Sequence, residues 1–127
     1  MTLTRPAALV VALLVSLAAT PVATQDSYYQ HYPNIPGEVI FENDRLVVQK
    51  YVVPPGQWEG VHPHPGNQLY VHIKGGEWTT RYGDEKETSV AEDGSVGWMP
   101  KVELSQDHES GNTGTTPIEF LWITLKE

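Results

Sequence analysis

Two histidines stand one residue apart near the middle of the chain, in the segment His62-Pro63-His64. Residues i and i+2 of an extended backbone point to the same side, so both imidazoles are directed at one locus, and Pro63 stiffens the backbone between them. A third histidine, His108, follows beyond a long stretch of strand-like sequence. Two imidazoles with one further ligand suit a divalent transition metal such as Fe, Zn, Mn or Ni. The pattern predicts one metal site; a metal-free protein in which the histidines cap a loop is the alternative.

The segments that must position these histidines are short, apolar or alternating runs bounded by turn sequences. They are residues 38–41, 45–53, 68–73, 77–82, 87–91, 95–99, 102–106 and 117–125. The sequences between them are rich in Gly, Pro, Asn and Asp, which favour turns, and no window shows an apolar repeat of a helical period. Eight short strands without helices predict an all-β antiparallel sandwich or barrel in one domain. Both faces of the last run are largely apolar, so we expect it to be a covered strand.

The surroundings of His62 and His64 resemble the first motif of the cupin superfamily of small jelly-roll barrels. That motif is a Gly, five residues, His, one residue, His, three residues, Glu, six residues and Gly. The chain matches every spacing from Gly56 to Gly75. The Glu position alone departs from the motif, because this chain has Gln68 there.

The second cupin motif is matched less closely. Its opening, a Gly followed after five residues by a Pro, fits Gly94 and Pro100, and its close, a His, three residues and an Asn, fits His108 and Asn112. The interval between the two parts is longer than usual. The resemblance covers residues 38–126 and implies a single cupin jelly-roll barrel of about eight antiparallel strands.

The resemblance also implies a ligand set, in which His62, His64 and His108 bind one divalent transition metal and Gln68 takes the place of a carboxylate ligand. An amide oxygen can coordinate, but the change removes one negative charge, so we expect a more weakly held and more electrophilic metal. It also removes a proton acceptor, so a mechanism that uses the family's Glu as general base does not transfer to this chain. The alternative for Gln68 is a hydrogen bond to the opposite strand.

Strand alternation from Gln68 turns Tyr70 and His72 into the barrel. His72 is a candidate catalytic residue, as the proton acceptor that Gln68 is not; it could also support a ligand or add a fourth one. The alternative is a buried neutral imidazole. Tyr70 and Trp98 are candidates for lining a pocket, Trp98 because it lies close to the second motif.

Three acidic residues neighbour the predicted ligands in sequence: Glu59, Asp107 and Glu109. Because adjacent residues on a strand point to opposite faces, we expect these carboxylates to be solvated rather than part of the site. Two of the four tryptophans, Trp78 and Trp122, are expected to pack in the barrel core.

The N-terminus has the order of a secretory signal peptide, with a basic residue, an apolar run at 7–19 and then small residues. We expect removal of residues 1–23 on export to the periplasm or the medium; an uncleaved anchor is the alternative, although the run is short for a bilayer span. Residues 24–37, polar and tyrosine-rich, predict an extended segment before a cupin domain at 38–127. The chain has no cysteine, so burial or a bound metal has to stabilise the exported product without disulfides.

The charge of the chain restricts its partners. Its 127 residues include 16 Asp and Glu against 8 Lys and Arg, a formal net charge of -8. Nucleic acids and anionic membranes select basic surfaces, so neither is an expected partner. A small organic molecule inside an aromatic barrel is the expected ligand.

A fold of this kind does not fix a function, which must come from the site. Three histidines around one metal predict a metal-dependent enzyme acting on a small organic molecule, with dioxygenase chemistry the commonest example among similar cupins. A non-catalytic module that binds or senses a small ligand or a metal is the first alternative, and a metal-free isomerase or epimerase is the second. The segment 24–37 further predicts a homodimer in which it packs across a partner barrel.

Overall fold

The structure is a computed structural model that describes residues 28–126. Within these residues it contains eight β-strands and a short 3-10 helix, Leu104–Gln106. The strands are β1 Glu38–Glu42, β2 Leu46–Val53, β3 Gln68–Lys74, β4 Gly76–Tyr82, β5 Glu85–Ala91, β6 Val96–Met99, β7 His108–Asn112 and β8 Ile118–Leu125. No helix in the described part of the chain is long and apolar enough to span a membrane. The predicted signal peptide lies outside the described residues.

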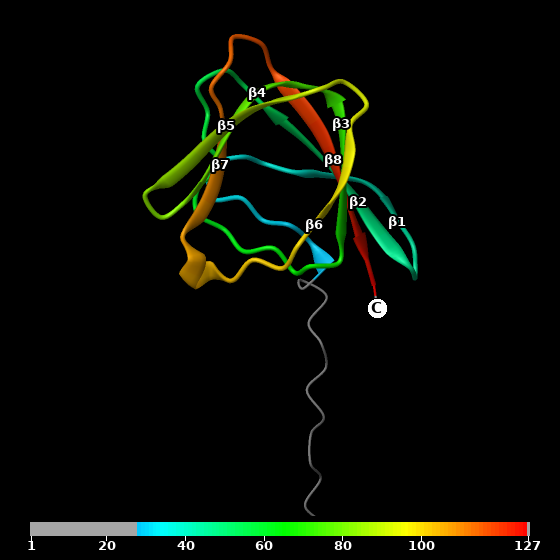
Figure 1. Cartoon of the computed structure of the whole chain (residues 1–127). Coiled ribbons are helices and arrows are strands. Elements are labelled where there is room, and N and C mark those ends of the chain that lie inside the picture. Colours follow the sequence, from blue (N-terminus) through cyan, green and yellow to red (C-terminus); the bar gives the residue numbers. More distant parts are fainter. Residues whose placement is uncertain (1–27, 127) are drawn as a thin grey trace, which may run out of the picture.

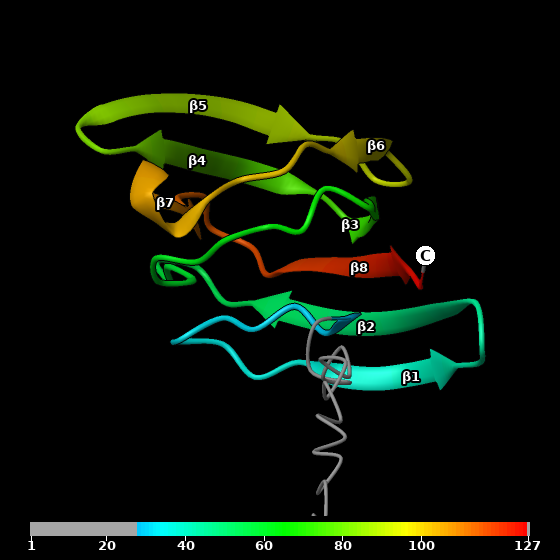
Figure 2. The ribbon, with the colours of Figure 1, turned by 90° about the horizontal axis from the view of Figure 1, so that it is seen from below.

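The strands form two antiparallel sheets that face each other across the core (Figure 1). The larger sheet has the order β1-β2-β8-β3-β6 and the smaller one the order β5-β4-β7. Figure 2 shows β1, β2 and β8 side by side, with β3 following β8. The prediction of an all-β antiparallel jelly-roll barrel is confirmed.

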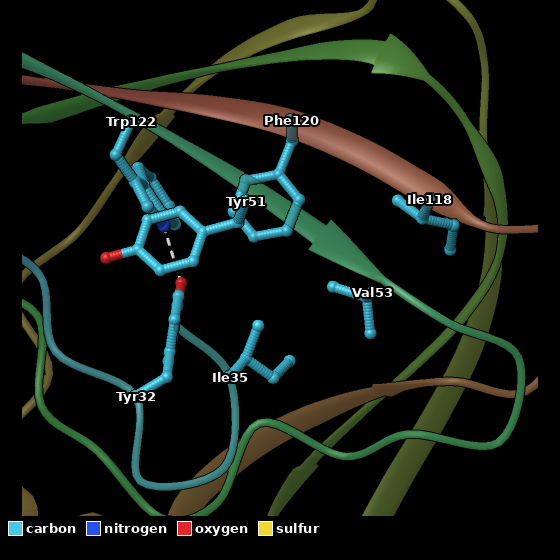
Figure 3. Packing of buried hydrophobic residues seen from close by; sticks show 7 residues of the cluster. All are labelled: Tyr32, Ile35, Tyr51, Val53, Ile118, Phe120 and Trp122. Carbon is cyan, nitrogen blue, oxygen red and sulfur yellow. Dashed lines mark hydrogen bonds between the residues drawn. The ribbon is translucent and has the colours of Figure 1, made fainter. Parts of the chain in front are cut away.

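Alternation along β2 and β8 builds the core. Every second residue of β8 from Ile118 to Thr124 is buried, and the residues between them are half-buried, as expected for a strand with neighbours on both sides. Tyr51 of β2 lies opposite Phe120 of β8, and their rings stack at 5.5 Å. These aromatic side chains pack in the core between the sheets (Figure 3).

The segment before β1 completes this core. Tyr32 and Ile35 are buried among the core side chains of the same barrel (Figure 3). Gln30 is also buried, its backbone N–H donates to Gln49 Oε1 at 2.7 Å, and its carbonyl accepts the Tyr51 hydroxyl. The described part of the predicted extended segment therefore packs against its own barrel, and the sequence did not reveal how much of it is buried.

Two local expectations differ from the structure. The run 102–106 is not a strand: Val102 forms an isolated bridge with His64, and the chain then turns into the 3-10 helix. The strand is instead β7, His-Glu-Ser-Gly-Asn, whose polar sequence carries no strand signal. Its backbone pairs with β4 and four of its five residues are buried, so tertiary pairing overrides weak propensity there.

Candidate metal centre

Backbone pairing brings the three predicted histidine ligands together. His62 and His64 lie in the connection between β2 and β3, whereas His108 begins β7. The His62 N–H donates to the His108 carbonyl at 3.0 Å, and the His64 N–H donates to the Val102 carbonyl at 2.9 Å. Backbone hydrogen bonds thus hold both ends of the His-Pro-His segment against the stretch 102–108, which ends at the third histidine.

The three imidazoles, called the His triad below, converge at one buried point. Their candidate ligand atoms all lie within 4.8 Å of one another, and His62 Nε2 and His64 Nε2 are 3.0 Å apart. Each residue is at most 3% exposed. Two ligands at a right angle around a metal, with bonds of about 2.1 Å, are separated by about 3.0 Å, so the spacing fits a shared ion.

Hydrogen bonds fix which nitrogen of each imidazole is free. The Nδ1 atoms of His62, His64 and His108 face, in turn, Gly60 O at 2.7 Å, Gln68 Oε1 at 3.0 Å and Arg81 O at 3.2 Å. All three partners are acceptors, so each Nδ1 carries a hydrogen and each Nε2 presents a lone pair to the centre. Lone pairs 3.0 Å apart repel each other, and a cation between them removes the repulsion. The donor set therefore fits a divalent transition metal.

Burial sets the charge of the triad as well. Desolvation lowers the pKa of His62 to about 3 and that of His64 to about 4, and it also lowers the pKa of His108. All three imidazoles are consequently neutral near pH 7. The neutral form is the one that binds a metal, so no proton has to leave before an ion enters.

Gln68 lies behind His64 rather than beside the three Nε2 atoms. Its side-chain oxygen accepts the hydrogen bond from His64 Nδ1, and its amide nitrogen donates to Gln30 Oε1 and Thr124 Oγ1, both at 3.1 Å. Gln68 is fully buried. In this arrangement Gln68 orients the His64 ring and also links β3 to its neighbouring strand β8.

A cavity of about 560 Å³ opens from the triad between the two sheets. His64 and His108 line one part of it, and Tyr70, Trp78, Phe120 and Trp122 supply aromatic walls. A space of this volume with such a lining suits a small organic molecule.

Tyr70 and His72 both line this cavity. His72 is half-buried, its Nδ1 lies 3.0 Å from Ser95 Oγ, and desolvation lowers its pKa. It is four residues from Gln68 on β3, about 13 Å along the strand, and it does not join the triad. Trp98 does not line the cavity and is 53% exposed. Trp98 pairs with Leu69, whose side chain must face outward because its neighbours on β3 face inward.

Glu59 belongs to the site, and the expectation that it is a solvated charge is wrong. Glu59 is 2% exposed, lines the cavity, and places Oε2 3.7 Å from His62 Nε2. The N–H groups of Glu59 and His62 donate to the carbonyls of Ser110 and His108. The chain therefore advances three residues, from 59 to 62, where its partner advances two, from 110 to 108. This β-bulge contains Gly60, at φ +85°, and it reverses the alternation on which the expectation depended.

The other two acids differ from Glu59. Asp107 is exposed, and Glu109 is half-buried in an ion pair with Arg81 at 2.7 Å. The sequence signal for Glu59 was the glycine directly after it, because a glycine inside a strand pattern often marks a bulge.

Solved structures of low sequence identity share this fold. A cupin domain from Bordetella pertussis Tohama I superposes with a TM-score of 0.64 at 23% identity, covering 78% of this chain and 100% of that one. A protein with a double-stranded β-helix domain from Klebsiella pneumoniae gives 0.54 at 22% identity, covering 84% and 90%. The polyketide cyclase RemF from Streptomyces resistomycificus gives 0.56 at 15% identity, covering 77% and 69%.

The sequence itself identifies the family. No curated protein matches the chain. The family model described as the cupin domain matches residues 49–124, which run from β2 through the whole His triad to β8. That match covers more than half of the chain, and the chain therefore belongs to the cupin domain family.

Proposed function

We propose that this protein is an exported cupin that binds one divalent transition metal and acts as a metal-dependent enzyme on a small organic molecule. One observation carries the proposal: each Nδ1 of the His triad is hydrogen-bonded to an acceptor, so three neutral Nε2 lone pairs converge. No hydrogen of the triad points into that space. This arrangement suits a cation and is poorly suited to a self-contained hydrogen-bond network.

The residues around the site have separate tasks in this proposal. The His triad holds the metal, and Gln68 keeps the His64 ring in its orientation. The aromatic walls, among them Trp122 and Tyr70, bind an apolar ligand and exclude water. His72, with its Nδ1 at Ser95 Oγ, holds or accepts a proton in another part of the cavity.

Dioxygenase-like chemistry is the leading reaction class within this proposal. A bound metal with an open position supplies Lewis-acid or oxygen-activating chemistry, and three neutral imidazoles are a ligand set suited to non-haem iron. The oxidant is molecular oxygen, and both of its atoms enter the organic product. The aromatic lining of the cavity favours phenolic or diketone substrates over charged polymers.

The test begins with the metal content of residues 24–127 produced without a His tag. Elemental analysis is expected to give close to one equivalent of a transition metal, and almost none in a His62→Ala, His108→Ala double variant. Iron-loaded protein is then incubated with phenols and diketones in an oxygen electrode. Oxygen uptake that requires both substrate and an intact triad supports the enzyme; absence of metal from protein refolded with Fe, Zn, Mn or Ni contradicts the proposal.

A non-catalytic binding or sensing module is the second candidate. It is favoured by Gln68, which offers no proton acceptor beside the metal and whose hydrogen-bonding atoms already have partners. Tight stoichiometric zinc, with saturable ligand binding and no turnover, identifies this candidate. A metal-free isomerase has to use histidines as acid–base groups, and turnover that survives complete chelation identifies it.

Export and homodimer formation are part of the proposal. The composition of the N-terminus supports export, and cleavage is tested by the N-terminal sequence of the mature protein. Phe41 on β1 and Trp98 on β6 are each more than half exposed on the larger sheet, which supports pairing of two barrels. A monomeric mass in solution contradicts the dimer.

A further inference from the structure

Glu59 is a buried carboxyl group without a cationic side chain to balance it. Its side chain is 3% exposed, and in the described part of the chain no lysine or arginine lies within ion-pairing distance. A buried carboxylate destabilises a protein strongly unless a positive charge compensates it. The fold nevertheless places this group inside the barrel, next to the His triad.

The hydrogen-bond donors of Glu59 are neutral. The carboxyl group accepts from the Tyr32 hydroxyl and from the Ser110 backbone N–H. The Tyr32 oxygen in turn accepts from Trp122 Nε1, as Figure 3 shows, so the tyrosine proton is left for Glu59. These donors hold the carboxyl group in place, but neither of them carries a positive charge.

The position of that charge follows from the atoms that face each other. Glu59 Oε2 lies 3.7 Å from His62 Nε2, which is too long for a hydrogen bond. His62 Nε2 carries no hydrogen, because Nδ1 carries it toward Gly60 O. Two ligand atoms of one metal are separated by about 3.0 to 3.5 Å, depending on the angle, so a small side-chain shift brings Oε2 to the ion.

We infer that the Glu59 carboxylate is a fourth protein ligand of the metal held by the His triad. The inference rests on the proposed function, because it needs a metal at the triad. Gln68 does not supply this ligand in the arrangement observed, since its oxygen faces His64 Nδ1. The carboxylate comes instead from the bulge that precedes His62, and it lowers the charge of a divalent site by one unit.

The local backbone is built to hold Glu59 inward. Gly60 has φ +85°, and a Cβ there would stand 2.9 Å from Pro33, so a larger residue fits neither the conformation nor the space. The Asn34 N–H donates to the Glu59 carbonyl at 3.0 Å. The segment before β1 thus covers the bulge and fixes the residue from outside, while Tyr32 fixes its carboxyl group from inside.

Glu59→Gln is the direct test, with Glu119→Gln as its matched control. Glu119 pairs with Lys50 on β2 and faces away from the core, so its variant changes the net charge equally without touching the site. Metal-stripped wild type, both variants and His62→Ala are titrated calorimetrically with Mn²⁺ and with Zn²⁺. X-ray absorption of the zinc-loaded proteins counts oxygen and nitrogen ligands, and thermal melts of the metal-free proteins report their stability.

We expect Glu59→Gln to weaken Mn²⁺ binding by more than about 10-fold and Zn²⁺ binding less, because carboxylates favour Mn²⁺ whereas imidazoles favour Zn²⁺. Metal-free Glu59→Gln should melt no lower than wild type, because the amide keeps the shape of the carboxyl group and places no charge in the buried site. A change in the number or the length of the oxygen and nitrogen contacts around zinc in the absorption spectrum completes the expected result. A structural defect would instead lower the melting temperature and both affinities together.

Two outcomes overturn the inference but not the proposed function. If His62→Ala abolishes binding while Glu59→Gln binds both metals like wild type, the triad stands and Glu59 is not a ligand. If Glu59→Gln melts well below wild type and loses both metals equally, Glu59 is a structural residue. Failure of wild type to bind either ion would overturn the proposed function itself, and with it this assignment.

Discussion

In the His triad every imidazole Nδ1 has an acceptor and each ring is almost completely buried, whereas His72 and the cavity residues Tyr70 and Ser95 beside it are only half-buried. His72 is held by a serine hydroxyl, which can either donate or accept. The triad is held by two backbone carbonyls and a buried amide, whose roles are fixed. The first region is therefore organised before any ion arrives, and the second can adapt to what enters.

This contrast assigns affinity and specificity to different parts of the barrel. Metal binding depends on a few rigid contacts, so small changes there should have large effects. Recognition of a small organic molecule depends on a wider, mostly apolar wall, over which each contact contributes less. Substitutions along the cavity should consequently show effects that decrease with distance from the triad.

Removing one ligand of the triad should produce the largest effect. His62→Ala is expected to weaken Zn²⁺ binding by more than about 100-fold, beyond the roughly 10- to 100-fold that loss of a supporting partner produces. The measurement is titration of metal-stripped protein in competition with a chromophoric chelator. His31→Ala is the matched control, because His31 is exposed and lies outside the triad. Equal affinities for the two variants would remove the basis for the triad as a metal site.

Metal should also stabilise the intact triad. At a free Zn²⁺ concentration of about 100 times Kd, binding to the native state alone adds about 2.7 kcal/mol to the free energy of unfolding. For a domain of this size that corresponds to a rise in melting temperature of roughly 10 to 20 °C. Differential scanning calorimetry of wild type with and without Zn²⁺ measures it, and His62→Ala should show almost no rise. A similar rise in both would indicate binding elsewhere.

Gln68→Ala should have an intermediate effect, because the residue contacts the triad from behind. Losing the acceptor at His64 Nδ1 is expected to weaken Zn²⁺ binding roughly 10- to 100-fold, since the ring can then rotate. Calorimetric titration of Gln68→Ala and His62→Ala under the same conditions distinguishes a residue that supports His64 from a direct metal ligand. A loss as large as that of His62→Ala would identify Gln68 as a direct ligand, and an unchanged affinity would show that His64 needs no such support.

Much of this organisation could be predicted from the sequence. The spacing in His62-Pro63-His64 is a local property of an extended chain, and the structure indeed brings the two Nε2 atoms to 3.0 Å. The two largely apolar faces of β8 likewise predicted a covered strand, and all of its residues are buried or half-buried. Such inferences succeed because neighbours in sequence decide them.

The failures occur where distant parts of the chain decide the outcome. Strand β7 is polar in sequence and becomes a strand because β4 pairs with it. Tyr32 comes from a segment without strand or helix pattern and is buried because the barrel offers a space for it. Glu59 was assigned to the wrong face because one bulge at Gly60 shifts the register by a residue.

The smallest effect is expected in the region around His72. His72→Asn keeps a group that can bond Ser95, and it should change Zn²⁺ affinity by no more than about twofold, because His72 lies about 13 Å along β3 from Gln68. The same variant should weaken binding of a phenolic probe such as catechol severalfold. Trp78 and Trp122 line the cavity, so quenching of tryptophan fluorescence in the zinc-loaded protein reports that binding.

The paired measurement matters more than either value alone. Unchanged zinc affinity with weaker catechol binding would show that the cavity separates metal binding from recognition of the organic ligand. A fall in zinc affinity as large as that of Gln68→Ala would contradict the separation, because it would mean that the region around His72 also orders the triad. Tyr70 would then be the first contact to examine, since its ring lies between those of His72 and Trp122, at 5.4 and 5.9 Å.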